Sequence, residues 1–248
     1  MIRKAYKLVI TLLFLFLIYT ITSATALSTY KEEVVACEKQ GITNTTNKIQ
    51  EITVKLEETQ KQIDISECVV IGDSNTVRMA LYKTSIADAK HISAIVGVGV
   101  GGFGSYARSN GLTHGKTLKS DLNTLPDTDL DNVIIMLGTN DYRKLEEDFK
   151  EQYINIINYI VSRNTSSNIY LITIPPVRDS KSSTIKNEDT DRISKFIREI
   201  PESLETKVSI IDLNSYLDPS NMSDSYGDEY HFSEAGAVKA ANYIVANL

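Results

Sequence analysis

Short apolar runs alternate with longer amphipathic stretches from about residue 66 onward, and this alternation limits the possible folds of the chain most strongly. The apolar runs lie at residues 68–72, 92–98, 132–137, 168–174 and 207–213. Continuous apolar runs of this kind are typical of strands that are buried on both faces, as in a parallel sheet. The pattern therefore predicts one doubly wound α/β domain with a mostly five-stranded parallel sheet.

The stretches between the apolar runs have the spacing of amphipathic helices. In residues 145–161, apolar side chains recur every three or four positions, as on the buried face of a helix. Residues 188–200 and 233–247 show similar spacing, and residues 75–83, directly after the first run, also favour a helix. Helices in these places would supply the crossover connections that parallel strands need.

The first 27 residues have the character of a targeting segment. Basic side chains precede an uncharged, mostly apolar stretch of about 20 residues from Leu8 to Leu27, which is long enough to span a bilayer. Ala24-Thr25-Ala26 also offers a signal-peptidase cleavage pattern. A cleaved signal peptide and a retained membrane anchor both remain open for residues 1–27. Either one predicts that the main domain lies outside the cytoplasm.

Residues 28–65 are mostly polar and predict a helical stalk or linker before the main domain, which spans residues 66–248. A stripe with 3-4-3-4 spacing runs through Ile49, Ile52, Leu56, Thr59 and Ile63. Two interpretations remain open for this segment. It is either a stalk that holds the domain away from a membrane or a helix that packs along the domain.

Composition narrows the class of protein further. The formal net charge is -6, from 26 basic and 32 acidic residues, which argues against a nucleic-acid partner. The sequence contains two cysteines, Cys37 and Cys68. They could form a disulfide in an oxidising compartment, and the alternative is that both thiols are unpaired. Neither cysteine has a histidine nearby in the sequence, so a thiol nucleophile or a metal site is not expected.

Two of the predicted strands end in polar strings, Gly72-Asp73-Ser74 and Gly138-Thr139-Asn140-Asp141. Ligands of doubly wound sheets bind at the carboxyl ends of the strands. Ser74 stands just before a predicted helix, whose N–H groups favour developing negative charge, although Ser74 as a simple N-cap is the alternative. The amide of Asn140 could donate to an oxyanion, and its alternative role is that of a turn residue.

Of the three histidines, His231 lies in a polar loop close to the C-terminus, at the start of the last predicted helix. Asp228 precedes His231 by three residues in a polar loop, so it could accept the ring N–H and leave the other nitrogen free to take a proton. The alternative is a surface histidine that caps the following helix. His91 precedes an apolar run and His114 lies in a polar loop flanked by glycines, so we expect no catalytic role for them.

A glycine-rich string at residues 97–104 contains the pattern G-x-G-x-x-G, which also occurs in dinucleotide-binding folds. That pattern belongs after the first strand, whereas this string follows the second apolar run. No apolar strand that ends in an acidic residue follows about 20 residues later. We therefore expect the glycines to allow a close approach between a backbone N–H and a ligand.

Taken in order, these four strings resemble the blocks of the SGNH (GDSL-type) hydrolases over about residues 66 to 248. The resemblance implies a flavodoxin-like three-layer α/β/α sandwich and neither a metal nor an organic cofactor. Ser74 is then the nucleophile, His231 the base and Asp228 the carboxylate that orients it. The resemblance also implies an oxyanion hole from the N–H groups of Ser74 and Gly102 and the amide of Asn140, with Gly101 as the alternative glycine.

The chain departs from the family pattern at two places. Asn75 follows the serine where many members have leucine, and no asparagine stands just before the glycines of the second block. Neither departure removes a catalytic group. Both leave the subfamily and the substrate open.

The resemblance and the predicted export together suggest a serine esterase that removes small acyl groups, O-acetyl groups above all, from a glycan of the cell envelope or extracellular space. The partners expected are that ester substrate and, if residues 1–27 are retained, a membrane. A lipid or thioester acylhydrolase is the alternative within the same chemistry. A metallophosphoesterase and a catalytically silent binding domain are the alternatives from other classes.

Overall fold

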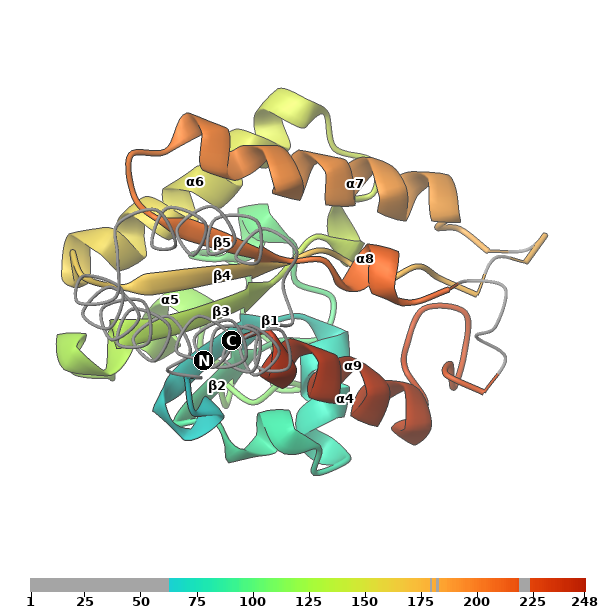
Figure 1. The fold of residues 1–248 in the computed structure, drawn as a ribbon, viewed down its shortest axis with the longest axis horizontal. Coiled ribbons are helices and arrows are strands. Elements are labelled where there is room, and N and C mark those ends of the chain that lie inside the picture. Colours follow the sequence, from blue (N-terminus) through green and yellow to red (C-terminus); the bar gives the residue numbers. More distant parts are fainter. Residues whose placement is uncertain (1–62, 179, 182, 219–223) are drawn as a thin grey trace, which may run out of the picture. The chain divides into compact units, whose positions relative to one another are not determined.

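A five-stranded, all-parallel sheet forms the centre of the structure (Figure 1). This computed structural model describes residues 63–178, 180–181, 183–218 and 224–248. The strands are β1 (Cys68–Gly72), β2 (His91–Ala94), β3 (Asn132–Met136), β4 (Asn168–Ile172) and β5 (Val208–Ile211). Their order in the sheet, β2-β1-β3-β4-β5, is the flavodoxin-like order, so the predicted fold class is confirmed.

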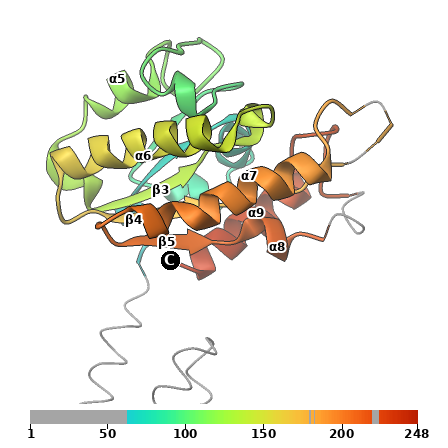
Figure 2. The same cartoon turned by 90° about the horizontal axis from the view of Figure 1, so that it is seen from above.

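Helices cover both faces of the sheet (Figures 1 and 2). One face carries α5 (Leu118–Leu122), α6 (Glu146–Arg163) and α7 (Asn187–Glu199), and the other carries α4 (Ser74–Leu81), α8 (Leu213–Tyr216) and α9 (Glu234–Ala246). Alternate side chains of β1 enter two separate cores, Val69 and Ile71 on the α6 side and Cys68 and Val70 on the α9 side. All five residues of β1 are buried, which explains its continuous apolar sequence.

The four longer helices, α4, α6, α7 and α9, begin and end within two residues of their predicted bounds. Their apolar side chains recur at helical spacing in the sequence, which made them predictable. On α6 the buried side chains are Phe149, Tyr153, Ile156, Ile157 and Ile160, which form one face of the helix. The sequence did not predict α5, which has too few residues for a period to be visible. It overestimated β2, because pairing with β1 ends at Ala94 and the chain turns at Gly97, whose φ is 81°.

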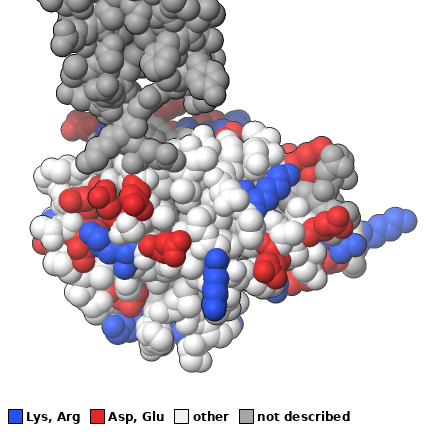
Figure 3. All heavy atoms as spheres, turned by 60° about the horizontal axis from the view of Figure 1, so that its bottom comes forward, with Lys and Arg blue, Asp and Glu red and all other residues white. Residues whose placement is uncertain are grey.

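The predicted targeting segment, residues 1–27, lies outside the described residues, as does nearly all of the predicted stalk at residues 28–65. Cys37 lies there too. Within the described residues, no helix combines the length and the apolar character that crossing a membrane requires. On the face that Figure 3 shows, acidic and basic side chains are interspersed among neutral ones.

The register of the central strands brings their carboxyl ends into line. Gly72, which ends β1, pairs with Ala94 at the end of β2 and with Met136 at the end of β3. After β1 the chain enters α4 on one face of the sheet, and after β3 it enters α6 on the opposite face. The loops that follow β1 and β3 therefore border the crevice in which such sheets bind their ligands.

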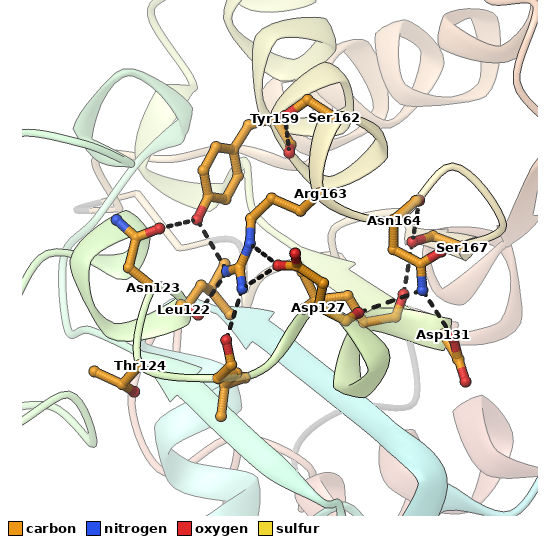
Figure 4. Close-up of polar contacts among 12 residues, drawn as sticks. Leu122, Asn123, Thr124, Asp127, Asp131, Tyr159, Ser162, Arg163, Asn164 and Ser167 are labelled. Atoms are coloured by element: carbon orange, nitrogen blue, oxygen red, sulfur yellow. Dashed lines mark hydrogen bonds and ion pairs between the residues drawn. The ribbon is translucent and has the colours of Figure 1, made fainter.

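A cluster of polar side chains at the C-terminal end of α6 bonds the segment between α5 and β3 (Figure 4). Arg163 donates from Nη1 to the carbonyl of Leu122 at 2.7 Å and from Nη2 to the carbonyl of Leu125 at 2.6 Å. Its Nε donates to Asp127 Oδ1 at 2.7 Å. The guanidinium thus bonds the carbonyl of the last residue of α5 and a carbonyl of the segment that follows it.

Replacing Arg163 by lysine tests this cluster. The single ammonium group cannot reproduce the fork of N–H donors, so we expect Arg163→Lys to lower the free energy of unfolding by about 2 kcal/mol. Urea denaturation measures the change. The exposed Arg108 provides the matched control, since Arg108→Lys should change the free energy of unfolding by less than about 0.5 kcal/mol. Equal effects of the two substitutions would contradict the stabilising role of Arg163.

Candidate active site

Ser74 is the first residue of α4 and follows β1 after a single residue. Asp73 is the N-cap of this helix, and its Oδ1 accepts a hydrogen bond from the N–H of Asn75 at 3.0 Å. The alternative prediction, that Ser74 itself is the N-cap, is therefore wrong. Because no described residue accepts from the Ser74 N–H, this donor remains available at the positive end of the helix.

The polar string after β3 binds the glycine-rich string directly. Asn140 Nδ2 donates to the carbonyl of Val98 at 2.9 Å, and Asp141 Oδ2 accepts from the N–H of Val100 at 2.9 Å. A Cβ atom on Gly99 would lie 2.5 Å from Asp141 Oδ1, so this approach requires glycine there. The structure thus brings Asn140 and the glycine string together, and one N–H of the Asn140 amide remains for another acceptor.

The two candidate glycines for the oxyanion hole lie in the 3-10 turn Val100–Gly102. The N–H of Gly102 donates to the carbonyl of Gly99 at 2.9 Å. Gly101 faces α6, because a Cβ atom on it would lie 2.6 Å from Gln152 Oε1. Which of the two donates to an oxyanion stays a prediction.

His231 and Asp228 form a pair in the loop of residues 225–233, which we call the acid–base loop. His231 Nδ1 lies 2.8 Å from Asp228 Oδ2, and no described residue bonds its Nε2. Asp228 Oδ1 accepts from the backbone N–H groups of Tyr230 and His231 at 2.9 and 2.8 Å. Partial burial acts to raise the pKa of Asp228, but these hydrogen bonds outweigh it and hold that pKa below its usual value.

The alternative for His231, a helix cap, is wrong, because Ser233 is the N-cap of α9 and accepts from the N–H of Gly236. The acid–base loop instead contacts α4. Asn75 Nδ2 donates to the carbonyl of Tyr230 at 3.1 Å, and Arg78 Nη2 lies 3.3 Å from Asp228 Oδ2.

The contacts that Asn75, Arg78 and Asp141 make are not predictable from the sequence. The only signal for Asn75 was that it departs from the usual leucine. Arg78 stands one turn after Ser74 in a helical segment, but its spacing says nothing about which loop it meets. Asp141 adjoins Asn140, but its bond to Val100 joins positions that are far apart in the sequence.

Other groups with metal-binding or nucleophilic chemistry play no part in this arrangement. Among the described residues, no three or more His, Cys, Asp or Glu side chains are grouped so that they could hold a metal ion. Cys68 is buried in β1 and free, and burial raises the pKa of its thiol to about 11. Its thiol is therefore protonated and unreactive at neutral pH.

Asp73 is a buried carboxyl group beside the candidate nucleophile. Burial raises its pKa to about 6, against the opposing effects of the hydrogen bond from Asn75 and the nearby charge of His231. In the folded protein Asp73 thus retains its proton to a higher pH than in the unfolded chain.

This pKa predicts a pH-dependent effect of Asp73→Asn. Between about pH 4 and 6 the folded protein binds the proton of Asp73 and the unfolded chain does not, so this stabilisation is lost as the pH rises. Asparagine keeps the capping oxygen but does not titrate. The free energy of unfolding of the variant, relative to the wild type, should therefore rise between about pH 4 and 7, by on the order of 2–3 kcal/mol. A difference that stays constant in urea denaturation over this range would contradict the raised pKa.

Comparison with known proteins shows the family of this chain. The model of the GDSL-like lipase/acylhydrolase family matches residues 70–239, which include Ser74, Asn140 and His231. No curated protein matches the sequence.

Solved structures share the fold. A Streptococcus pneumonia protein provisionally described as a platelet activating factor has a TM-score of 0.57 at 16% identity, over 91% of this chain and 99% of its own. The lipase/acylhydrolase from Enterococcus faecalis has a TM-score of 0.51 at 21% identity, over 73% and 94%. A family two carbohydrate esterase from Clostridium thermocellum, solved in complex with cellohexaose, has a TM-score of 0.51 at 19% identity, over 73% and 62%. With the family match over most of its length, this chain belongs to the GDSL-like lipase/acylhydrolase family.

Proposed function

We propose that this protein is an esterase that hydrolyses small acyl esters, O-acetyl esters above all, on a glycan outside the cytoplasm. The observation that carries the proposal is the pair of His231 and Asp228 at 2.8 Å, in a loop bonded to the helix that begins with Ser74. A nucleophile, a base and an orienting carboxylate are the groups that acyl transfer to water needs.

In the proposed mechanism Asp228 accepts the Nδ1–H of His231 and fixes its tautomer, so that Nε2 takes the hydroxyl proton of Ser74. Ser74 Oγ then attacks the ester carbonyl. The protonated His231 returns that proton to the leaving alcohol, which leaves an acyl-enzyme. Water attacks the acyl-enzyme with His231 again as base, and this step releases the carboxylic acid and restores Ser74.

The developing oxyanion is met by the N–H of Ser74, the free N–H of the Asn140 amide and a backbone N–H of the glycine string, from Gly102 or Gly101. Each such donor is typically worth about 3 kcal/mol in the transition state. The bonds of Asn140 to Val98 and of Asp141 to Val100 support this role, because they fix the donors before the substrate arrives.

The substrate class rests on two supports. A carbohydrate esterase in complex with an oligosaccharide has a similar fold. A pocket of about 310 Å³ lies beside the glycine string along α5 and α6, and Lys119, Gln152, Asn155 and Tyr159 contribute to its lining, which includes none of Ser74, Asn140 and His231. Ammonium, amide and aromatic groups together suit the hydroxyls and apolar faces of a sugar better than a long acyl chain.

The location outside the cytoplasm is supported by the sequence of residues 1–27 alone. Its basic start, apolar stretch and cleavage pattern favour export. If residues 1–27 are retained, they anchor the enzyme to the membrane. A glycan of the cell envelope is within reach from there.

Acetate release from a panel of acetylated glycans tests the proposal. We expect the wild-type protein to release acetate and Ser74→Ala to be inactive, with at least about a 1,000-fold lower rate. Ser85→Ala, which removes a hydroxyl outside the site, should keep the wild-type rate. Acetate release by Ser74→Ala at the wild-type rate would contradict the assignment of Ser74 as the nucleophile.

The same protein should hydrolyse p-nitrophenyl acetate faster than p-nitrophenyl octanoate, since the proposed acyl group is small. A clear preference for octanoate would instead favour the lipid acylhydrolase.

A further inference from the structure

Asn75, the residue directly after Ser74, bonds the backbone on both sides of His231. Its Nδ2 donates to the carbonyl of Tyr230 at 3.1 Å, and its Oδ1 accepts from the N–H of Phe232 at 3.0 Å. The side chain is almost fully buried, with 1% of the residue exposed. Both ends of one amide are thus paired with the two peptide groups that flank the histidine.

The acid–base loop contains neither helix nor strand, so its place depends on bonds to its neighbours, which include a bond from the Arg178 N–H to the carbonyl of Glu229 at 3.0 Å and the bonds to α4. Its own backbone ties are the bonds from Gly227 N–H to His231 O and from Ser233 N–H to Ser225 O, both at 2.9 Å. These bonds close the loop on itself but do not fix it against α4. The bond between Asn75 and the Phe232 N–H is buried and the bond to the Tyr230 carbonyl is partly buried, so water competes little with them.

Asn75 is itself held firmly. Its backbone N–H donates to Asp73 Oδ1, and it lies in the first turn of α4. Arg78 adds a second tie from the next turn, with Nη1 donating to the carbonyl of Phe232 at 3.2 Å. The Arg78 side chain is 31% exposed, so its tie is weaker than that of the buried amide.

We propose that Asn75 is a positioning residue that holds His231 at the place where it can take the proton of Ser74. This inference rests on the proposed function. Because Ser74 and Asn75 are consecutive residues of one helix, the nucleophile and the group that fixes the base cannot move apart. Leucine, the residue that many members of the family have here, offers no hydrogen bond to the acid–base loop.

Kinetics of Asn75→Ala on p-nitrophenyl acetate test the inference. We expect kcat to fall by about 10- to 100-fold, because a displaced base loses proton transfer, while KM changes by less than about threefold. The matched control is Thr76→Val, which removes a buried hydroxyl from the same turn of α4 and should leave kcat within about twofold. Asn75→Asp, a variant of equal size, replaces the donor toward Tyr230 by an acceptor and should also lower kcat by at least about tenfold.

A double-mutant cycle with His231→Ala separates positioning from a merely structural role. If Asn75 acts through His231, Asn75→Ala should change the residual single-turnover acylation rate of His231→Ala by less than about twofold. An equal loss of rate with and without His231 would overturn the inference, as would wild-type kcat in both Asn75 variants. Full activity of His231→Ala alone would instead show that the proposed function has failed.

Discussion

The register of three central strands is the constraint on which the rest of the site depends. Gly72, Ala94 and Met136 lie side by side at the ends of β1, β2 and β3, so the three loops that follow must meet at one edge of the sheet. Burial of both faces of β1 and β3 fixes the register of this pair, since a shift by one residue would exchange the side chains of the two cores. The fold therefore places a serine, an asparagine and a glycine-rich loop together before any contact among them is considered.

Side-chain bonds to backbone groups then turn this proximity into a defined arrangement. Asn140 and Asp141 bind the glycine string, and Asn75 binds the loop that carries His231. The arrangement also buries two carboxyl groups, which lowers the stability of their charged forms. Burial raises the pKa of both Asp73 and Asp141 above the usual value. Buried carboxyl groups of this kind are common at functional sites, where they fix neighbouring donors at the expense of stability.

The sequence predicted the sheet, the four longer helices and the strings that meet at the sheet edge, because apolar spacing and chain order are local properties. It did not predict the partners of Asn75 and Asp141, which lie far away in the sequence and depend on loop conformation. It also left open whether Gly101 or Gly102 supplies a donor to an oxyanion, because the 3-10 turn, in which the N–H of Gly102 bonds the carbonyl of Gly99, is not visible in the sequence. A backbone donor cannot be judged free until the turn that contains it is known.

The central claim is that Ser74 becomes a covalent nucleophile when His231 removes its proton. Treatment with a fluorophosphonate, followed by mass spectrometry of the peptides, tests it most directly. The account predicts one phosphonyl adduct on Ser74, formed much more slowly in His231→Ala. An adduct on another residue, no adduct at all, or labelling of Ser74 at the same rate without His231 would contradict it.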